Sequence, residues 1–275
     1  MTEPQSMRAW RRARGGSVGF VPTMGYLHAG HISLVEAARQ QNETTVVSIF
    51  VNPTQFGPNE DFTRYPRDEV RDLALLKEAG VDAVYLPAVG DMYPEGHQTS
   101  VVVGAITQRL EGAARPGHFD GVATVVTKLF NAVEADRAYF GRKDAQQLRV
   151  IQRMVCDLDM AVEIVPCDIV RESDGLAMSS RNVYLTPEQR AAAPVISRTL
   201  FEARDRFVAG LVDAEALRTF VRSGISTSPL AEIEYVSVAD NDSLEELDHP
   251  VTGRALLSVV VRFGRTRLLD NVELG

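Results

Sequence analysis

The chain has little cysteine and no long hydrophobic run. Its only cysteines are Cys156 and Cys167, too few for a disulfide framework and without the C-x-x-C spacing of a zinc site. Residues 1–16 mix arginines with polar residues and lack the apolar core of a secretory signal. No segment offers the roughly twenty consecutive apolar residues of a membrane helix. We therefore expect a cytoplasmic protein that does not enter a membrane.

Net positive charge and the common nucleotide-binding motifs are also missing. The 29 Lys and Arg residues stand against 37 Asp and Glu, a formal net charge of -8. This balance argues against nucleic acid and anionic membranes as partners, because both are polyanions, but it allows a local basic pocket. Neither G-x-G-x-x-G nor G-x-x-x-x-G-K-[ST] occurs. Any nucleotide site must therefore be of another type.

Strand-like and helix-like segments alternate through the first part of the chain. Apolar, β-branched runs predict strands at residues 17–22, 44–51, 82–87, 100–106, 137–140 and 162–171. Helical spacing of apolar residues predicts helices at 32–40, 67–79, 122–133 and 143–158. The run 44–51 is apolar almost throughout, so we expect it at the centre of the sheet. The alternation predicts an α/β fold with a Rossmann-like, doubly wound parallel sheet.

The pattern changes near residue 175. Two helices are expected at residues 186–209 and 213–223, followed by strands at 232–239 and 255–263. This order is typical of an α+β unit. We expect two domains, residues 1–175 with the parallel sheet and residues 176–275 as a smaller α+β C-terminal domain.

The most informative segment is PTMGYLHAGH, residues 22–31, which follows the first expected strand and opens the first expected helix. Ligands bind at this carboxyl edge of the strands in open α/β sheets. His28 and His31 are about one helical turn apart, so their ring N–H groups can join the backbone N–H groups of the helix start in a phosphate site. Gly30 lets a ligand approach the backbone. A capping or core pair and a metal pair remain alternatives.

Two further segments combine polar groups with turns. Asn52 and Gln55 are uncharged amides that can donate to a carboxylate or hydroxyl, although this segment also reads as a plain proline turn. The loop 111–121 carries Arg115 and His118 among glycines. It is either an ordinary surface loop or a functional one.

Two more segments carry groups suited to phosphates. Lys143 can reach a phosphate as a mobile point charge, and Asp144 can accept from ribose hydroxyls or simply begin a solvated helix. The polar segment 173–182 places Ser179 and Ser180 beside Arg181. Such a segment suits a loop that closes over a polyphosphate, or a linker.

An H-x-G-H motif early and an M-S-S-R loop late resemble the signatures of the HIGH/KMSKS nucleotidyltransferase superfamily. Within it, the chain is similar to the pantothenate synthetase (pantoate-β-alanine ligase) family. The likeness runs from about residue 8 to the C-terminus. It is densest in PTMGYLHAGH, FVNPTQF, EGAARPGHFDG, FGRKDAQQL and LAMSSRN.

The resemblance implies a set of site residues in this chain. ATP would be contacted by Met24, His28, Gly30, His31, Gly141, Lys143, Asp144, Met178, Ser179, Ser180 and Arg181, with Gly141 and Asp144 at the ribose and Met178 beside the adenine. Pantoate would be held by Gln55 and Gln147, with Asn52 beside them and Met24 lining the pocket. The catalytic set would be His28, His31, Lys143 and Arg181. Mg²⁺ would bridge phosphate oxygens with Asp72 as the candidate metal ligand.

The resemblance implies a reaction that joins pantoate to β-alanine with ATP, through pantoyl adenylate. It also implies a homodimer. In each subunit, residues 1–175 would bind ATP and pantoate, and the C-terminal domain would act as a lid. Two alternatives remain open. A related nucleotidyltransferase would move AMP onto a phosphate-bearing acceptor, and would need more basic residues than the amides Asn52, Gln55 and Gln147. A non-catalytic nucleotide-binding regulator on the same fold would not need both the histidine pair and the Ser-Ser-Arg loop.

Overall fold

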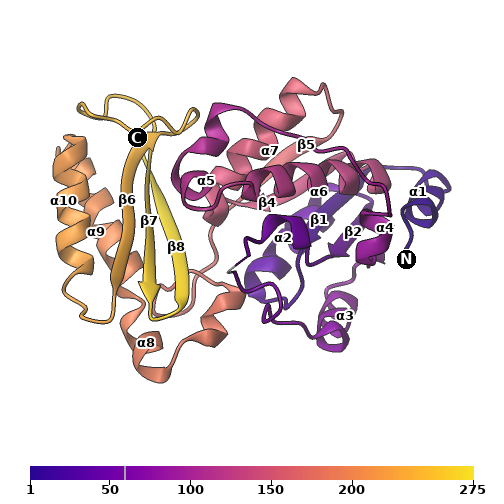
Figure 1. Ribbon diagram of the computed structural model, residues 1–275, viewed down its shortest axis with the longest axis horizontal. Coiled ribbons are helices and arrows are strands. Elements are labelled where there is room, and N and C mark those ends of the chain that lie inside the picture. The colour runs from indigo at the N-terminus through magenta and orange to yellow at the C-terminus, as the bar shows by residue number, and fades with distance from the viewer. Residues whose placement is uncertain (59) are drawn as a thin grey trace. The chain divides into compact units, whose positions relative to one another are not determined.

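The computed structural model describes residues 1–58 and 60–275 and divides into two compact units (Figure 1). The N-terminal unit comprises residues 1–142 and 146–168, and the C-terminal unit comprises residues 143–145 and 169–275. The domain boundary expected after residue 175 lies inside the C-terminal unit. Residues 143–145 belong to that unit although their sequence neighbours on both sides belong to the other.

The N-terminal unit is built on a five-stranded sheet whose neighbouring strands are all parallel. Its order is β3-β2-β1-β4-β5, with β1 Val18–Thr23, β2 Thr44–Ile49, β3 Ala83–Tyr85, β4 Arg137–Gly141 and β5 Glu163–Cys167. The α/β fold with a doubly wound sheet is confirmed. The central strand is β1, so the expectation that residues 44–51 lie at the centre is wrong. Since β2 is paired on both edges, it carries the same apolar pattern as a central strand.

Helices cover both faces of this sheet. Along β1, Phe20 packs in one cluster with Phe130 and Ile151, whereas the adjacent Val21 packs on the opposite face with Val35. This alternation follows from the two-residue period of a strand. The helices and 3-10 turns are α1 Pro4–Arg12, α2 Ala29–Gln41, η1 Pro53–Gln55, α3 Glu69–Glu78, α4 Val89–Met92, η2 Ala105–Gln108, α5 Leu110–Ala114, α6 His118–Val133, η3 Arg142–Asp144 and α7 Ala145–Asp157. None of the described helices is both long and apolar enough to span a membrane.

The strand expected at residues 100–106 does not form; residues 101–104 are irregular and η2 follows them. Val103 is buried in the core as its apolar character predicts. Backbone groups of the segment form hydrogen bonds with side chains. The Val101 N–H donates to Thr124 Oγ1, and the Val103 carbonyl accepts from the Thr107 hydroxyl. Val103 is the one buried residue of this segment and Val102 is exposed, so the apolar run did not indicate a paired strand.

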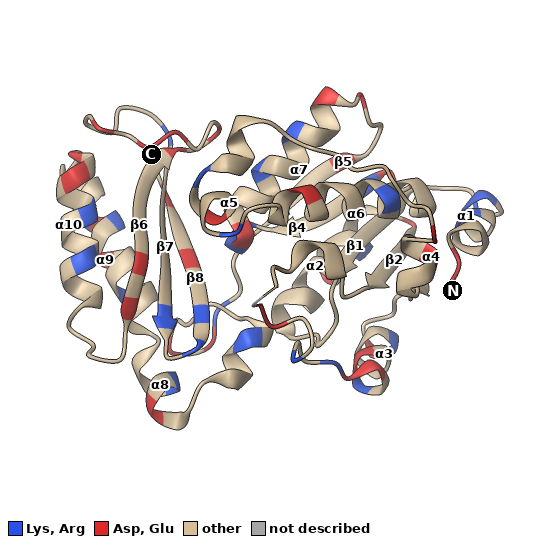
Figure 2. Ribbon diagram, viewed as in Figure 1, with Lys and Arg blue, Asp and Glu red and all other residues tan. Residues whose placement is uncertain are grey.

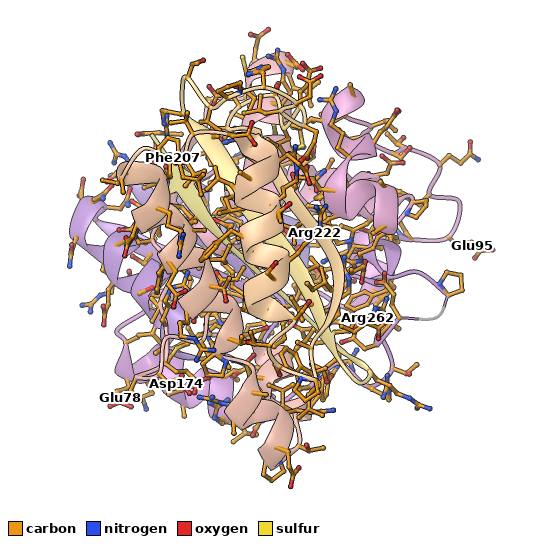
Figure 3. All side chains as sticks on the ribbon, turned by 90° about the vertical axis from the view of Figure 1, so that its left-hand side faces the viewer. Glu78, Glu95, Asp174, Phe207, Arg222 and Arg262 are labelled. Atoms are coloured by element: carbon orange, nitrogen blue, oxygen red, sulfur yellow. The ribbon has the colours of Figure 1, made fainter. Side chains whose placement is uncertain are left out.

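The C-terminal unit is α+β, as expected. It contains η4 Ser180–Tyr184, α8 Pro187–Ala192, α9 Val195–Val208, α10 Ala214–Ile225, β6 Glu232–Asp240, β7 Ala255–Phe263 and β8 Thr266–Leu274, with the strands antiparallel in the order β6-β7-β8. Helices α9 and α10 lie against the sheet (Figure 1), and Figure 3 shows α10, with Arg222, in front of the strands. Figure 2 shows acidic and basic segments interspersed on these helices and strands.

Two features of this unit differ from the sequence-based expectation. The single helix expected at 186–209 is two helices, because Pro194 has no N–H to continue the first and serves as the N-cap of α9. Strand β8 was not anticipated. Its middle residues, Asp270 and Asn271, are polar although buried, and they interrupt the apolar pattern of a strand.

The loop between β1 and α2 is held by a buried carboxylate from α3. Asp72 is 1% exposed, and its two oxygens accept the N–H groups of Tyr26 at 2.6 Å and Leu27 at 2.8 Å. Gly25 and Tyr26 have φ of 83° and 50°, a region that costs energy for a residue with a side chain. The Arg71 guanidinium donates to the Leu27 carbonyl at 3.0 Å. Helix α3 thus fixes the backbone of the loop that leads to the histidine pair.

Asp72→Asn should therefore destabilise the chain. The amide places an NH2 group against one of the two backbone N–H donors, so one buried donor loses its acceptor at a cost of about 1–3 kcal/mol. Chemical denaturation of the variant measures this loss in the free energy of unfolding. Glu78→Gln, an exposed change on the same helix, is the matched control. Equal stability of the Asp72 variant and this control would show that the carboxylate does not hold the loop.

Candidate active site

His28 and His31 cap the N-terminus of α2. His28 is the N-cap, and its Nδ1 accepts the Gly30 N–H at 3.1 Å. His31 Nδ1 accepts the His28 N–H at 3.3 Å, and the two ring centroids are 4.0 Å apart. The reciprocal pattern is that of a capping box, with imidazole nitrogens in place of the usual oxygen acceptors.

This cap determines which ring nitrogen can donate. A nitrogen that accepts a backbone N–H carries no proton, so each neutral ring has its proton on Nε2. The capping interpretation and the phosphate interpretation of the pair are therefore compatible. Nδ1 satisfies the helix end, and this tautomer places the ring proton on Nε2, a nitrogen that can donate to an anion.

Met24, Asn52 and Gln55, which the resemblance implies for the pantoate site, contact one another. Gln55 Nε2 lies 3.2 Å from the Met24 sulfur, and Asn52 Nδ2 donates to Gln55 Oε1 at 3.1 Å and to the Gly121 carbonyl at 3.1 Å. The thioether is a weak acceptor. Gln55 therefore keeps an amide N–H donor at the side of Met24, whereas its oxygen is occupied by Asn52.

Asn52 acts as a support within this group. It is 1% exposed, and its oxygen accepts from the Thr54 N–H, the Thr54 hydroxyl and the Tyr93 hydroxyl. Together with the two bonds from Nδ2, these contacts use both ends of the amide. Asn52 fixes the turn η1 and the orientation of Gln55.

Residues 111–121, expected as a loop, instead comprise most of α5, a short turn and the start of α6, and they also support η1. His118 Nδ1 lies 2.8 Å from the Gln55 carbonyl, and Arg115 donates to that carbonyl and to both oxygens of Glu60. His118 Nε2 lies 3.1 Å from an Arg115 nitrogen, so the neutral Nδ1–H tautomer satisfies both contacts. A Cβ on Gly121 would lie 2.4 Å from the Thr54 carbonyl oxygen, so only glycine allows this approach.

The environment of this cluster shifts two pKa values downward. Burial, assisted by the charge of Arg115, lowers the pKa of His118 to about 4. For Glu60, burial opposes ionisation, but the hydrogen bonds and charge of Arg115 outweigh it and lower the pKa. The cluster therefore holds a neutral imidazole next to an ion pair.

The two adjacent glutamines at the start of α7 have different environments. Gln146 is buried, accepts the Glu111 N–H at 2.9 Å and donates to the carbonyls of Ile106 and Arg109 at 2.8 and 2.7 Å. Successive helix residues point about 100° apart, and Gln147 is half-buried. Gln146 thus anchors the segment before α5, and the half-buried Gln147 is not part of these contacts.

Three of the predicted phosphate-binding residues line one pocket in the C-terminal unit. These are Lys143, Ser179 and Arg181, and the other lining residues are Leu176, Ala177, Asn182, Ile196, Arg267, Leu268, Leu269 and Asp270. Ser179 is the N-cap of η4, and its hydroxyl accepts the Arg181 N–H at 3.3 Å. The pocket combines an ammonium, guanidinium groups and a hydroxyl, a donor set that suits phosphate oxygens.

The other residues predicted to contact ATP differ in burial and in the contacts that they make. Ser180 is buried beside Ser179, the Met178 N–H donates to the Val170 carbonyl at 3.0 Å, and Asp144 is exposed with Oδ1 3.9 Å from the Lys143 ammonium. A Cβ on Gly141 would meet no atom of the described residues within 4 Å. Packing among the described residues therefore does not require glycine at this position. Met24, His28, Gly30, His31 and Gly141 belong to the N-terminal unit and the others to the C-terminal unit.

The described residues do not provide a set of protein ligands for Mg²⁺. In the described part of the chain, no group of three or more His, Cys, Asp or Glu side chains could hold a metal ion. Asp72, the candidate ligand, is buried with both oxygens bonded to backbone N–H groups. It fits a structural role better than ligation, and we derive no step through a protein-bound metal.

Several residues of these sites escaped the sequence analysis. Glu60 and Tyr93 support the turn η1, while Asp270 and Arg267 line the C-terminal pocket. None lies in a motif that follows a predicted strand. For Asp270, the available signal was a polar pair, Asp-Asn, between Leu269 and Val272.

Comparisons with known proteins identify relatives over nearly the whole chain. A sequence model of the family described as pantoate-β-alanine ligase matches residues 1–273. A pantothenate synthetase from Roseiflexus castenholzii is 60% identical over 267 residues, which cover 97% of this chain and 96% of that protein.

Two solved structures share the fold. The pantothenate synthetase of Thermus thermophilus matches with a TM-score of 0.93 and 50% identity, over 99% of this chain and 98% of that one. A pantoate-β-alanine ligase of Francisella tularensis, in complex with β,γ-ATP and β-alanine, matches with a TM-score of 0.81 and 33% identity, over 99% and 96%. Sequence and structure agree over nearly the whole length, so this chain belongs to the pantoate-β-alanine ligase family.

Proposed function

We propose that this chain condenses pantoate with β-alanine at the expense of ATP, through pantoyl adenylate. In the first half-reaction, a pantoate carboxylate oxygen bonds to the α-phosphorus of ATP as the bond to pyrophosphate breaks. In the second, the β-alanine amine attacks the acyl carbon, AMP leaves and the amine loses a proton. The family match over residues 1–273 is the observation that carries the proposal.

The first half-reaction needs no nucleophile from the protein. A carboxylate is already ionised at neutral pH, so the chain has to align it with the α-phosphorus and stabilise charge on the departing pyrophosphate. We assign that stabilisation to Lys143, Arg181 and Ser179, which share one pocket. His28 and His31 donate to phosphate oxygens through Nε2 in this proposal, together with the N-terminus of α2.

We assign the pantoate to the neutral groups around η1. Gln55 offers N–H donors beside Met24, and Gln147 adds a second amide. An uncharged pocket binds a carboxylate without neutralising it, which keeps the oxygen nucleophilic. A phosphate-bearing acceptor would call for more cations at this position.

Three further properties are part of the proposal. The enzyme is cytoplasmic, forms a homodimer and uses ATP with Mg²⁺ held chiefly by phosphate oxygens, as is common for this ion. Sedimentation that gave only monomer at micromolar concentration would contradict the dimer.

The direct test of the function is AMP formation with ATP, Mg²⁺, pantoate and β-alanine. We expect AMP in amounts equal to the pantothenate formed, and pyrophosphate exchange into ATP that requires pantoate but not β-alanine. Exchange driven by a mononucleotide instead would favour the related nucleotidyltransferase. Tight ATP binding without AMP formation from any acid would favour a nucleotide-binding regulator.

Lys143→Ala should lower the rate of pantoyl adenylate formation by roughly a hundredfold or more, because the ammonium stabilises charge that develops on pyrophosphate. Preformed pantoyl adenylate should react with β-alanine at nearly the normal rate, since pyrophosphate is absent from that step. Single-turnover measurements of each half-reaction decide this, with Lys77→Ala, an exposed lysine change on α3, as the control. If both half-reactions were impaired equally, Lys143 would not have the role of stabilising charge on pyrophosphate.

The support of Gln55 depends on a neutral His118, so stability should depend on pH. His118 has its pKa lowered to about 4 in the folded chain against an ordinary value near 6.5. As pH falls below about 6.5, the unfolded state takes up a proton that the folded state does not, and the stabilisation present at higher pH is lost. Between about pH 7 and pH 5 the loss is about 1–2 kcal/mol.

His118→Gln should flatten this part of the pH dependence of the free energy of unfolding. Chemical denaturation at several pH values measures it, in a range above that in which most carboxylates titrate. His249→Gln, a change at an exposed histidine, should leave the slope unchanged. A His118 variant with the wild-type slope would show that this imidazole is not held neutral.

A further inference from the structure

Strand β8 carries two adjacent polar residues in its buried middle. Asp270 is 3% exposed and Asn271 is 5% exposed. Burying a carboxylate and an amide is unfavourable unless both are hydrogen-bonded. Their partners are on the two segments that contribute the phosphate-binding residues of the C-terminal pocket.

Asn271 binds the segment of Lys143. Its Nδ2 donates to the Lys143 carbonyl oxygen at 2.8 Å, across 128 positions of sequence. The contact holds the peptide group from which the Lys143 side chain projects. Both residues of this contact belong to the C-terminal unit.

Asp270 binds the segment that leads into the Ser179–Arg181 loop. It forms a two-point ion pair with Arg171, at 2.6 and 3.0 Å, and Arg171 also donates to the Gly175 carbonyl at 3.1 Å. Arg171 pairs with Ala177 in an isolated antiparallel bridge. The ion pair therefore fixes the base of the turn from which residues 178–181 continue.

The two contacts are themselves coupled. Asp270 Oδ1 accepts the Asn271 N–H at 2.8 Å, and β8 also packs against η4, which begins at Ser180. Two neighbouring positions on one strand thus hold Lys143 on one side and the Ser179–Arg181 loop on the other. A strand paired along its length with β7 is a rigid base for both.

We propose that Asn271 and Asp270 are positioning residues that set the distance between the Lys143 ammonium and the Ser179–Arg181 loop. This inference rests on the proposed function, because it takes those groups to bind the phosphates of ATP. The carboxylate of Asp270 is paired with Arg171. It therefore acts by holding the loop and not as a ligand.

The test uses Asn271→Ala, alone and combined with Lys143→Ala. The bond from Asn271 goes to the backbone of Lys143, so Lys143→Ala leaves that bond in place but removes the group to be positioned. A positioning role requires Lys143 to be present, whereas a purely structural role gives the same effect with or without it. The readouts are the single-turnover rate of adenylate formation, the affinity for a non-hydrolysable ATP analogue and the Tm.

We expect Asn271→Ala to slow adenylate formation by roughly 10- to 100-fold in the wild-type background, as for a displaced catalytic group. In the Lys143→Ala background the further loss should be less than about twofold. The fall in Tm should be the same in both backgrounds. Ser258→Ala is the matched control, because Ser258 lies opposite Asn271 on β7 and its hydroxyl has no hydrogen-bond partner among the described residues.

Equal loss of rate in both backgrounds, or no loss in either, would overturn the proposal. Asn271→Asp, which keeps the size of the side chain but removes the donor, provides a second variant; if neither variant folds, Asn271 is a folding residue and the proposal is wrong. If wild-type protein forms no adenylate from pantoate, the proposed function fails separately. In that case the affinity for the ATP analogue decides the positioning role. The effect of Asn271→Ala on this affinity is compared between the wild-type and the Lys143→Ala backgrounds.

Discussion

Loops at the carboxyl ends of parallel strands have no neighbouring strand to satisfy their backbone, so their N–H and C=O groups must find partners elsewhere. In this chain buried side chains supply many of those partners. Asp72 holds the loop after β1, and Asn52 and His118 hold the turn after β2. The shape of the candidate site depends on these bonds, because they fix the backbone of the segments that carry the proposed ligand-binding side chains.

In the C-terminal unit, side chains of an antiparallel sheet provide partners for backbone groups outside the strands. Its pocket is lined partly by β8, but neither Lys143 nor the Ser179–Arg181 segment belongs to a strand. The buried pair on β8 replaces the missing strand contacts, at the cost of placing two polar side chains in a sheet interior. Such pairs are tolerated when every group is bonded, and they then specify one arrangement.

Much of the fold followed from the sequence because long periodic segments report burial directly. The strands β1, β2 and β4 and the helices α2 and α6 were predictable from apolar spacing, and the motifs that follow β1, β2 and β4 were predictable from the topology of parallel sheets. The segment at residues 100–106 was predicted wrongly because a short apolar run does not by itself indicate pairing; only Val103 in it is buried, and the Val101 N–H bonds to a side chain. The break at Pro194 was readable in principle, since proline cannot continue a helix.

The supporting residues were harder to find, for a physical reason. The residues proposed to bind ligands after β1, β2 and β4 lie near a strand end and have a suitable functional group, so position and chemistry together single them out. A supporting residue is constrained only by the partner that it meets in the folded chain, as Asp270 meets Arg171 across 99 positions. Local sequence therefore shows only that a polar residue occupies an apolar context. Asp270 and Asn271 in β8 and Asn52 after β2 share this feature, which makes buried polar residues inside apolar segments the places to look for such supports in a chain of this kind.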